Sequence, residues 1–327
     1  MSSLAESARV SVFVQAYNTA RYVGECLESI LRQESTYVRE VFVIDDASTD
    51  GTSEEVARFE RAGVRLVRHA RNLGATATAN EGYAAASGEF VIRLDSDDRL
   101  RPGFFAALVP ALIETPTAGL AYSDIAVIDD RGHVSAERVL GRESGSSVKD
   151  EFFALLVENY MPAPTTVVRR TALAPLLPIP STLSFVDWYI TTGIAERWAC
   201  AYVDAVLADY RVCPGSLHHT MVRDRSGEAS SLDVLDRLYA DGQRTTEKRR
   251  WRRRVYGSHY LTYADKYFGS RMNSDARRCY WQAVRYEPWR LLNFGVARRM
   301  AATVIGRRAY DALKAPWTAR GEAPDSR

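Results

Sequence analysis

The sequence has few cysteines and no long hydrophobic run. Its four cysteines (Cys26, Cys200, Cys213, Cys279) include no C-x-x-C pair, which argues against a disulfide framework or a zinc site and favours a reducing compartment. Nowhere do about 18 apolar residues follow one another, the length that a membrane-spanning helix needs. The N-terminal MSSLAESAR contains an acid and no apolar run, unlike a signal peptide. We therefore expect a cytoplasmic protein, and a peripheral contact with the inner face of the membrane stays open.

An excess of one charge is also absent. The chain has 43 basic and 41 acidic side chains and a net charge of +2, which is too even to indicate nucleic-acid binding by the whole protein. No G-x-G-x-x-G follows the first predicted strand and no G-K-[ST] loop occurs, which argues against a nicotinamide enzyme and a P-loop enzyme. The 327 residues, 46% hydrophobic and 26% charged, have the composition of a globular protein of one large or two ordinary domains.

Strand-like and helix-like segments alternate in the first third of the chain. Short apolar runs predict buried strands at 10–14, 41–44, 64–67 and 90–94. Amphipathic or small-residue segments predict helices at about 22–31, 56–59, 74–86 and 103–113. This order predicts an α/β protein with a mostly parallel, doubly wound sheet that helices cover on both faces. Residues 120–225 are expected to complete the sheet and build the acceptor side, and the pattern is helical from about 231.

Acidic clusters follow two of these strands. Asp45-Asp46 ends one and Asp95-Ser96-Asp97-Asp98 ends the other, and the carboxyl ends of parallel strands border one crevice. Two carboxylates two positions apart suit a hard divalent cation that also holds a diphosphate. A bare D-x-D is more often a solvated turn with helix-capping acids, so the motif needs its context.

Several motifs supply that context, in one order and spacing: VSVFVQAYN, ECLESILRQ, VFVIDDASTDGT, RNLGATATANEGYAAASGEFVIRLDSDDRLRPG and DYRVCPGSL. Over about residues 9–220 the chain resembles the family 2 glycosyltransferases. The resemblance implies a GT-A catalytic domain over 1–225, with a helical C-terminal region over 226–327. It also implies Mg or Mn as cofactor and inverting transfer of a sugar from a nucleoside-diphosphate sugar, UDP- or dTDP-linked, to a carbohydrate, lipid-linked or other hydroxyl acceptor.

The resemblance also assigns site residues. Asp45 and Asp46 match the pair that holds the nucleoside, and Arg71 matches a position that contacts the base or ribose. Asp97 is the expected metal ligand, with Asp95 near both the metal and the ribose. The remaining expected donor contacts are Ala16, Tyr17 and Ser96.

Two stretches depart from the family pattern. Phe185–Tyr189 resembles the E-D-W block, but Val186 stands where a Glu is usual, so Asp187 alone is expected to be the catalytic base. The alternative for Asp187 is a bond to nearby backbone or to an Arg. In Y-R-x-H, Cys213 replaces the His; His218 or His219 could ligate the metal instead or lie on the surface, and Arg211 could bind the diphosphate or hold the fold.

Other acidic and basic features have two interpretations each. Asp124 follows a predicted strand and could face the acceptor. The basic run 248–254 is either a solvated helix face or a contact for anionic lipid or an acidic acceptor. The later pattern of Tyr280, Trp281, Val284, Tyr286 and Trp289 among arginines suits a membrane interface or a helical core equally. No RNA-binding motif accompanies this charge, so no nucleic-acid partner is expected.

Two rival functions remain. A sugar-nucleotide pyrophosphorylase would carry a Gly-rich, basic nucleotide loop soon after the first strand, and VFVQAYNTARY is not one. A catalytically inactive relative that serves as a binding or scaffold subunit is the alternative that Val186 and Cys213 keep open. We expect a glycosyltransferase of polysaccharide or glycoconjugate biosynthesis.

Overall fold

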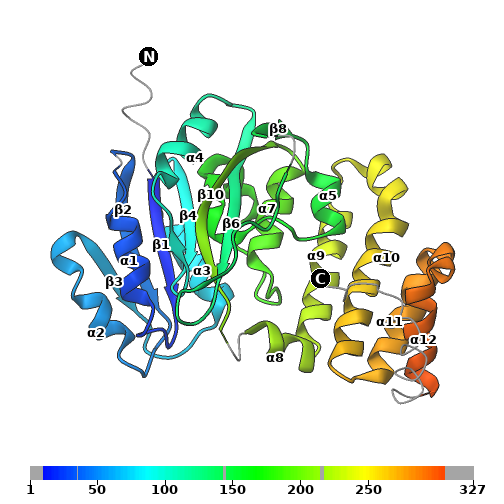
Figure 1. The fold of residues 1–327 in the computed structure, drawn as a ribbon. Coiled ribbons are helices and arrows are strands. Elements are labelled where there is room, and N and C mark those ends of the chain that lie inside the picture. Colours follow the sequence, from blue (N-terminus) through cyan, green and yellow to red (C-terminus); the bar gives the residue numbers. More distant parts are fainter. Residues whose placement is uncertain (1–9, 35, 143–144, 214–216, 306–327) are drawn as a thin grey trace. The chain divides into compact units, whose positions relative to one another are not determined.

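The computed structural model describes residues 10–34, 36–142, 145–213 and 217–305, and it confirms the predicted α/β sheet followed by helices (Figure 1). Contacts within the chain divide it into two compact units, Met1–Ser216 and Leu217–Arg327. The assignment of separate functions to the parts before and after residue 225 stays a prediction.

Four parallel strands form one half of the sheet in the first unit. Strand β1 (Val10–Ala16) lies between β2 (Val38–Asp45) and β4 (Phe90–Asp95), and β3 (Val64–Arg68) extends the sheet beyond β2. The apolar runs of β1, β2 and β4 fit strands that are buried on both faces, whereas the edge strand β3 (VRLVR) is partly exposed. In this register Gln15 lies opposite Ile44 on one side and Asp95 on the other, so the strands end side by side.

The other half of the sheet is mixed. Strand β9 (Val167–Arg169) pairs antiparallel with both β4 and β6 (Ala118–Ile128), and β10 (Ala199–Arg211) runs parallel to β6. Two short strands, β5 (Arg99–Leu100) and β8 (Ser147–Lys149), pair with β10. A third, β7 (Val134–Ala136), pairs with β6. The prediction that residues 120–225 complete the sheet is therefore confirmed, whereas the antiparallel insertion was not predicted.

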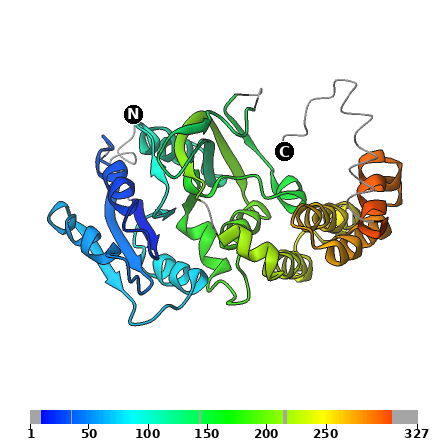
Figure 2. The same ribbon diagram turned by 60° about the horizontal axis from the view of Figure 1, so that its bottom comes forward.

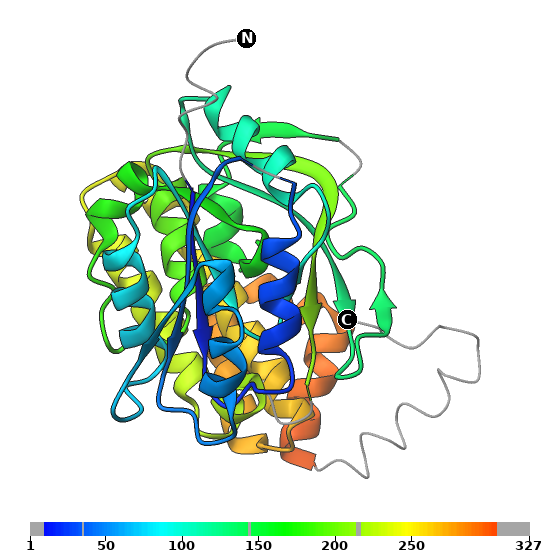
Figure 3. The same ribbon diagram turned by 90° about the vertical axis from the view of Figure 1, so that its left-hand side faces the viewer.

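Helices cover both faces of this sheet. The face that carries Val10, Val12 and Val14 packs against α1 (Val23–Leu31), α2 (Thr52–Ala57) and α4 (Phe104–Ile113). Figure 3 shows α1, in dark blue, in front of the strands. On the opposite face lie α3 (Ala75–Ala85) and α7 (Val186–Ala195). The shorter elements are η1 (Glu60–Ala62), α5 (Phe152–Val157), η2 (Ala163–Thr165), α6 (Arg170–Leu173) and η3 (Ala174–Leu176).

The second unit is helical. It consists of α8 (Leu217–Arg223), α9 (Ser226–Ala240), α10 (Thr245–Gly269), α11 (Asn273–Tyr286), η4 (Pro288–Leu292) and α12 (Phe294–Ile305). Helices α10 and α11 pack along each other, and Figure 2 shows them nearly end-on. Tyr256 and Tyr260 of α10 stack on Tyr286 of α11. Within the described ranges no helix is both long and apolar enough to cross a bilayer.

One close approach fixes α3 against the sheet. The Phe13 ring lies directly over Gly82, so that a Cβ added there would overlap the ring. Phe13 also makes an edge contact with Tyr83, with ring centroids 4.9 Å apart, and stacks on Phe42. Only a glycine at position 82 lets the helix approach this closely.

Gly82→Ala should therefore destabilise the first unit. Alanine favours a helix over glycine by about 1 kcal/mol, but overpacking a buried contact costs about 1–3 kcal/mol. We expect a net loss and a lower urea midpoint. Gly269→Ala is the matched control, because it is also helical and no atom lies within 4 Å of the added Cβ. Equal midpoints for both variants would contradict the close approach.

Candidate active site

The end of β1 joins the two acidic strand ends. The Ala16 carbonyl accepts a hydrogen bond from the Asp46 amide (2.9 Å), and the Gln15 carbonyl accepts one from the Ser96 amide (3.1 Å). The Ser96 side chain is buried and shares a 2.8 Å hydrogen bond with the Thr19 hydroxyl. The structure thus brings the predicted residues Ala16, Asp46 and Ser96 together. Tyr17, the next residue after β1, is 51% exposed at this edge.

Asp45 is buried beneath this edge. Its Oδ1 accepts the Ser48 amide at 2.9 Å, and its Oδ2 accepts the Ser53 hydroxyl and lies 3.8 Å from Arg68 Nε. These bonds hold the loop after β2 against the start of α2. The carboxylate therefore points into the protein, and its contact with a nucleoside stays a prediction.

Asp46 ties two loops together. Its Oδ1 accepts the Leu73 amide at 2.7 Å and its Oδ2 accepts the Gly74 amide at 2.8 Å, while His69 Nδ1 lies 2.7 Å from Oδ1. Burial alone would raise the pKa of Asp46, but the hydrogen bonds from His69 and the two amides outweigh burial and lower it. Arg71 belongs to the loop that Asp46 holds, and its side chain is exposed.

Asp95 is paired with an arginine of its own strand. Arg93 Nη1 lies 3.2 Å from Asp95 Oδ1 and donates to Gln15 Oε1 at 2.6 Å. Because side chains alternate along a strand, Gln15, Arg93 and Asp95 all lie on the face that carries α3 and α7. The pair fixes the Asp95 carboxylate while leaving it 39% exposed.

Asp97 and Asp98 occupy a turn that β10 holds in place. The Arg211 amide donates to Asp98 Oδ1 at 2.9 Å, and Arg211 Nε donates to the Asp97 carbonyl at 2.7 Å. The guanidinium also binds Glu25 at 2.6 Å and stacks over the Tyr22 ring. Of the two roles considered for Arg211, its contacts are those of a residue that holds the fold.

The carboxylates in this turn repel one another. Burial and the nearby Asp95 charge raise the pKa of Asp97 to about 6. Burial and the charges of Asp97 and Asp95 raise the pKa of Asp98 well above its usual range. In the described structure the buried Asp98 Oδ2 accepts no hydrogen bond.

The turn fits a divalent cation through oxygen ligands. No three His, Cys, Asp or Glu side chains within the described ranges gather as a complete metal cluster. Asp95 and Asp97 supply two carboxylates at an accessible edge, and a cation that also binds a diphosphate and water needs no more from the protein. The side chains of His218 and His219 lie outside the described part of the chain, so their ligation stays a prediction.

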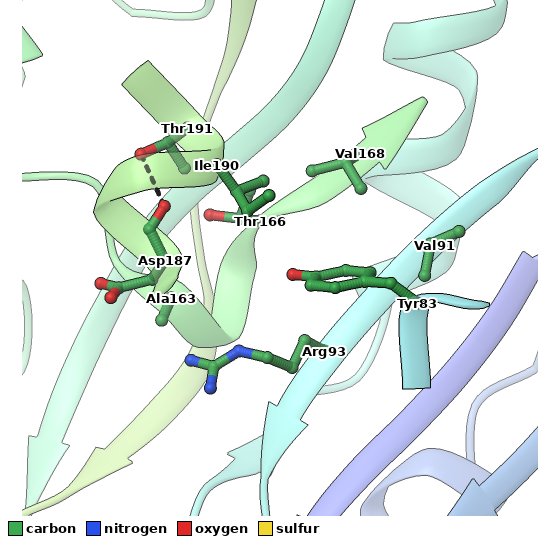
Figure 4. Close-up of a pocket in the computed structure, with 9 residues that line it drawn as sticks. All are labelled: Tyr83, Val91, Arg93, Ala163, Thr166, Val168, Asp187, Ile190 and Thr191. Carbon is green, nitrogen blue, oxygen red and sulfur yellow. Dashed lines mark hydrogen bonds between the residues drawn. The ribbon is translucent and has the colours of Figure 1, made fainter. Parts of the chain in front are cut away.

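Asp187 lies in the first turn of α7, over the same face of the sheet. Its Oδ2 accepts a 3.2 Å hydrogen bond from Asn159, and it borders a pocket of about 20 Å³. Figure 4 shows Tyr83 and Arg93 extending into this pocket from the side opposite α7. Burial would lower the pKa of Arg93, but the charges of Asp95, Tyr83 and Asp187 outweigh it and raise the pKa.

Arg93 and Asn159 are site residues that the sequence predictions missed. Arg93 had a signal, because a single charge inside the apolar run FVIRLD needs a buried partner. Asn159 had none, since its contact with Asp187 comes from residues far apart in the chain.

Two other residues have structural partners. Asp124 is fully buried, and its carboxylate accepts the backbone amides of 139, 140 and 141 at 2.8–2.9 Å. These bonds hold a loop, so Asp124 does not face an acceptor here. Cys213 lies 3.6 Å from the Tyr22 hydroxyl.

A sequence model of the family described as glycosyl transferase family 2 matches residues 11–174. The chain belongs to this family and is a glycosyltransferase. The match covers nearly all of β1, the strands β2 to β9 and both acidic turns, but it ends before Asp187 and β10.

Known proteins similar to this glycosyltransferase include one curated relative and two solved structures. The relative is the succinoglycan biosynthesis protein ExoO of Rhizobium meliloti, 43% identical over 93 residues, which are 28% of this chain and 26% of ExoO. The matched part of this chain spans about half or less of the length of the first curated relatives.

The solved structures are those of S. aureus TarS and of a mannosyltransferase. TarS 1–349 gives a TM-score of 0.65 at 18% identity and covers 93% of this chain and 88% of TarS 1–349. PcManGT from Pyrobaculum calidifontis, in complex with GDP-Man and Mn2+, gives a TM-score of 0.58 at 21% identity. The match covers 96% of this chain and 89% of PcManGT. At these identities the likeness concerns the fold, and it confirms the predicted GT-A fold with C-terminal helices.

Asp97→Asn should stabilise the metal-free glycosyltransferase at pH 7. The folded state raises the pKa of Asp97 to about 6, above the ~3.9 of an unfolded aspartate, so the ionised carboxylate costs the native state about 3 kcal/mol. An amide removes this cost. The folded state binds this proton more tightly than the unfolded state does, so the gain should shrink as the pH falls from about 7 toward about 4.

Urea unfolding in the presence of a chelator measures this difference. Glu158→Gln removes one exposed negative charge from the same unit and should leave the midpoint unchanged. If Asp97→Asn is no more stable than the wild type at neutral pH, the ionised Asp97 carboxylate does not destabilise the folded state.

Proposed function

We propose that this glycosyltransferase moves a sugar from a UDP- or dTDP-linked donor to an acceptor hydroxyl with inversion of the anomeric centre. The observation that carries the proposal is the shared face of Asp95 and Asp187, with Arg93 between β4 and α7. Asp95 lies at the end of β4, where the donor diphosphate would bind, and Asp187 borders the pocket over the same face of the sheet. This arrangement supports a single displacement between donor and acceptor.

In the proposed reaction Asp187 accepts the proton of the acceptor hydroxyl. The hydroxyl oxygen then forms a bond to the anomeric carbon as the bond to the diphosphate oxygen breaks, and the nucleoside diphosphate leaves with the electron pair. A general base of this kind contributes about 10²–10⁴-fold to the rate. Asn159 orients the carboxylate, since it donates to Asp187 Oδ2 and leaves Oδ1 for the acceptor.

Asp97 and Asp95 would hold a Mg or Mn ion together with the donor diphosphate. A cation there offsets the negative charge that grows on the departing group. Arg93 keeps Asp95 oriented, and Arg211 holds the turn that carries Asp97. Mn2+ is present with GDP-Man in PcManGT, which supports the choice of metal.

The donor base would bind between Tyr17 and the loop that Asp46 fixes. The exposed Tyr17 ring offers a stacking surface, and Arg71 lies within that loop. TarS binds UDP-GlcNAc and PcManGT binds GDP-Man, so structures of this fold accept more than one base. The base is therefore the first quantity to measure.

Calorimetry with nucleoside diphosphates and their sugars, with and without Mn, tests the donor site. We expect metal-dependent binding of one uridine or thymidine nucleotide. Asp97→Ala should weaken it by about 100-fold, within the range of a lost charge-assisted contact. Glu158→Gln is the charge-matched control and should bind as the wild type does.

The outcomes of this panel separate the alternatives. Tight binding of a guanosine nucleotide would correct the proposed base and keep the metal site. A nucleotide affinity that changes neither on removal of Mn nor in the Asp97→Ala variant would exclude the D-x-D turn from the mechanism. A folded protein that binds none of these nucleotides would contradict the proposed donor.

Asp187→Asn should strongly reduce transfer and spare donor binding. The amide keeps the shape of the side chain but cannot accept the acceptor proton, so we expect turnover to fall about 10³-fold. A coupled assay for released nucleoside diphosphate measures turnover, and calorimetry measures the donor. Turnover within about twofold of wild type would exclude Asp187 as the base.

The acceptor would be a growing glycan or a lipid-linked sugar in polysaccharide or glycoconjugate assembly. ExoO, similar over 93 residues, is named for succinoglycan biosynthesis. The pocket of about 20 Å³ beside Asp187 has room for a hydroxyl group next to the carboxylate.

A further inference from the structure

The second unit separates its aromatic residues into two groups. Tyr280 and Val284 of α11 are buried, Tyr280 packs against Tyr263 and Tyr267 of α10, and Tyr286 stacks on two other α10 tyrosines. The two tryptophans of the same pattern are exposed instead, Trp281 by 59% and Trp289 by 56%. A helical core therefore accounts for the tyrosines and not for the tryptophans.

The basic run of α10 divides in the same way. Lys248 is buried, and its Nζ donates to carbonyls at the end of α9. Arg250, Arg253 and Arg254 are exposed and border a groove of about 640 Å³, whose opposite wall includes Trp289 and Arg290 of η4. The run is thus part structural and part surface.

Exposed apolar side chains follow Trp289 along η4. In η4, Trp289 is followed by Arg290, Leu291 and Leu292, and Leu292 is 87% exposed, the highest value among the exposed large hydrophobic residues. We call Arg250, Arg253, Arg254, Trp289, Leu291 and Leu292 the basic-apolar patch. Adjacent exposed apolar residues of this kind mark an interaction surface rather than ordinary scatter.

The patch is held in shape by its own contacts. Arg253 donates to the Tyr286 carbonyl at 2.9 Å and lies 5.9 Å from the centre of the Trp289 ring. Arg290 binds Glu287 and donates to Ser258 at 2.9 Å, which fixes η4 on α10. Glu287, the acid in the described lining of the groove, is buried in this pair. The exposed charge beside the apolar residues is therefore positive.

We propose that the basic-apolar patch docks the enzyme on an anionic lipid bilayer. Arginines attract acidic headgroups, while tryptophan and leucine insert at the boundary between headgroups and acyl chains. A dissolved polyanion would satisfy the arginines but leave Leu291 and Leu292 in water. A bilayer surface satisfies both parts, and this proposal does not depend on the sugar or the base.

Vesicle co-sedimentation with the full chain tests this docking. We expect binding to phosphatidylcholine vesicles in which about a third of the lipid is phosphatidylglycerol, and little to phosphatidylcholine alone. About 1 M salt should weaken binding, because it screens the headgroup charge. Arg250→Gln with Arg254→Gln should lower the partition coefficient by about 30-fold. This factor assumes that each arginine contributes about 1 kcal/mol of attraction to the anionic surface.

Matched variants separate the patch from net charge and from general hydrophobicity. Arg249→Gln with Arg252→Gln removes the same charge from α10 outside the groove and should change binding by less than about threefold. Leu292→Ser should weaken it by about tenfold. Val304→Ser, at an exposed apolar position outside the groove, should not.

Three results would overturn the proposal. The first is no sedimentation with anionic vesicles by a folded wild type. The second is an equal loss of binding in the patch and control pairs. The third is binding of polyuridylate or heparin through the same arginines without vesicle binding, which would assign the patch to a dissolved polyanion.

Discussion

The carboxyl end of β1 is the constraint on which the catalytic edge depends. Its last two carbonyls accept the first amides beyond β2 and β4, so Asp46 and Ser96 cannot move independently of the central strand. Each backbone bond contributes only about 1 kcal/mol net, but together they fix where two loops leave the sheet. The loop that begins at Asp46 and the D-x-D turn therefore share one rigid support, and the register of β1 sets the distance between them.

This edge concentrates negative charge, and a few cations decide which carboxylates are free. Arg68 and the serines bind Asp45, Arg93 holds Asp95, and Arg211 binds carbonyls and Glu25 rather than the Asp97 carboxylate. Within the described ranges no ion pair to the Asp97 carboxylate is formed, and the charge of Arg211 offsets only part of the burial and repulsion that raise its pKa. A protein optimised for stability alone would place a partner beside it. An unpaired, partly buried carboxylate is what a metal-binding turn requires, at the expense of stability in the metal-free state.

The fold was predictable where the local pattern and the tertiary structure agree. Strands β1 to β4 and helices α1 to α4 follow from hydrophobic patterning, because β1, β2 and β4 each contain a short apolar run and β3 (VRLVR) alternates apolar and basic residues. Strand β9 has three residues and pairs antiparallel with neighbours distant in sequence, so no local signal marks it. At the site, the acids were found from motifs, but their partners were not. Asp45 and Asp124 turn inward through amides and hydroxyls that only the folded loops bring near. The pattern of aromatic and basic residues in α10 and α11 was ambiguous for a similar reason. Helical spacing alone does not show which aromatic residues are buried between the helices and which are exposed.

The two proposals assign different tasks to the two units. The first unit carries every residue proposed for donor and base, so donor binding can be measured in solution whether or not a lipid surface is present. The basic-apolar patch has no proposed role in the transfer reaction itself. Its proposed role is to raise the concentration of a lipid-linked acceptor around the enzyme. If the acceptor is lipid-linked, an enzyme held at the bilayer meets it at an effective concentration far above the bulk value, without any added contact to the sugar. If the acceptor is a dissolved glycan, the same docking would lower the rate of encounter. Lipid docking and a lipid-linked acceptor therefore support each other, and the response of turnover to anionic vesicles links two properties that reside in separate units of the chain.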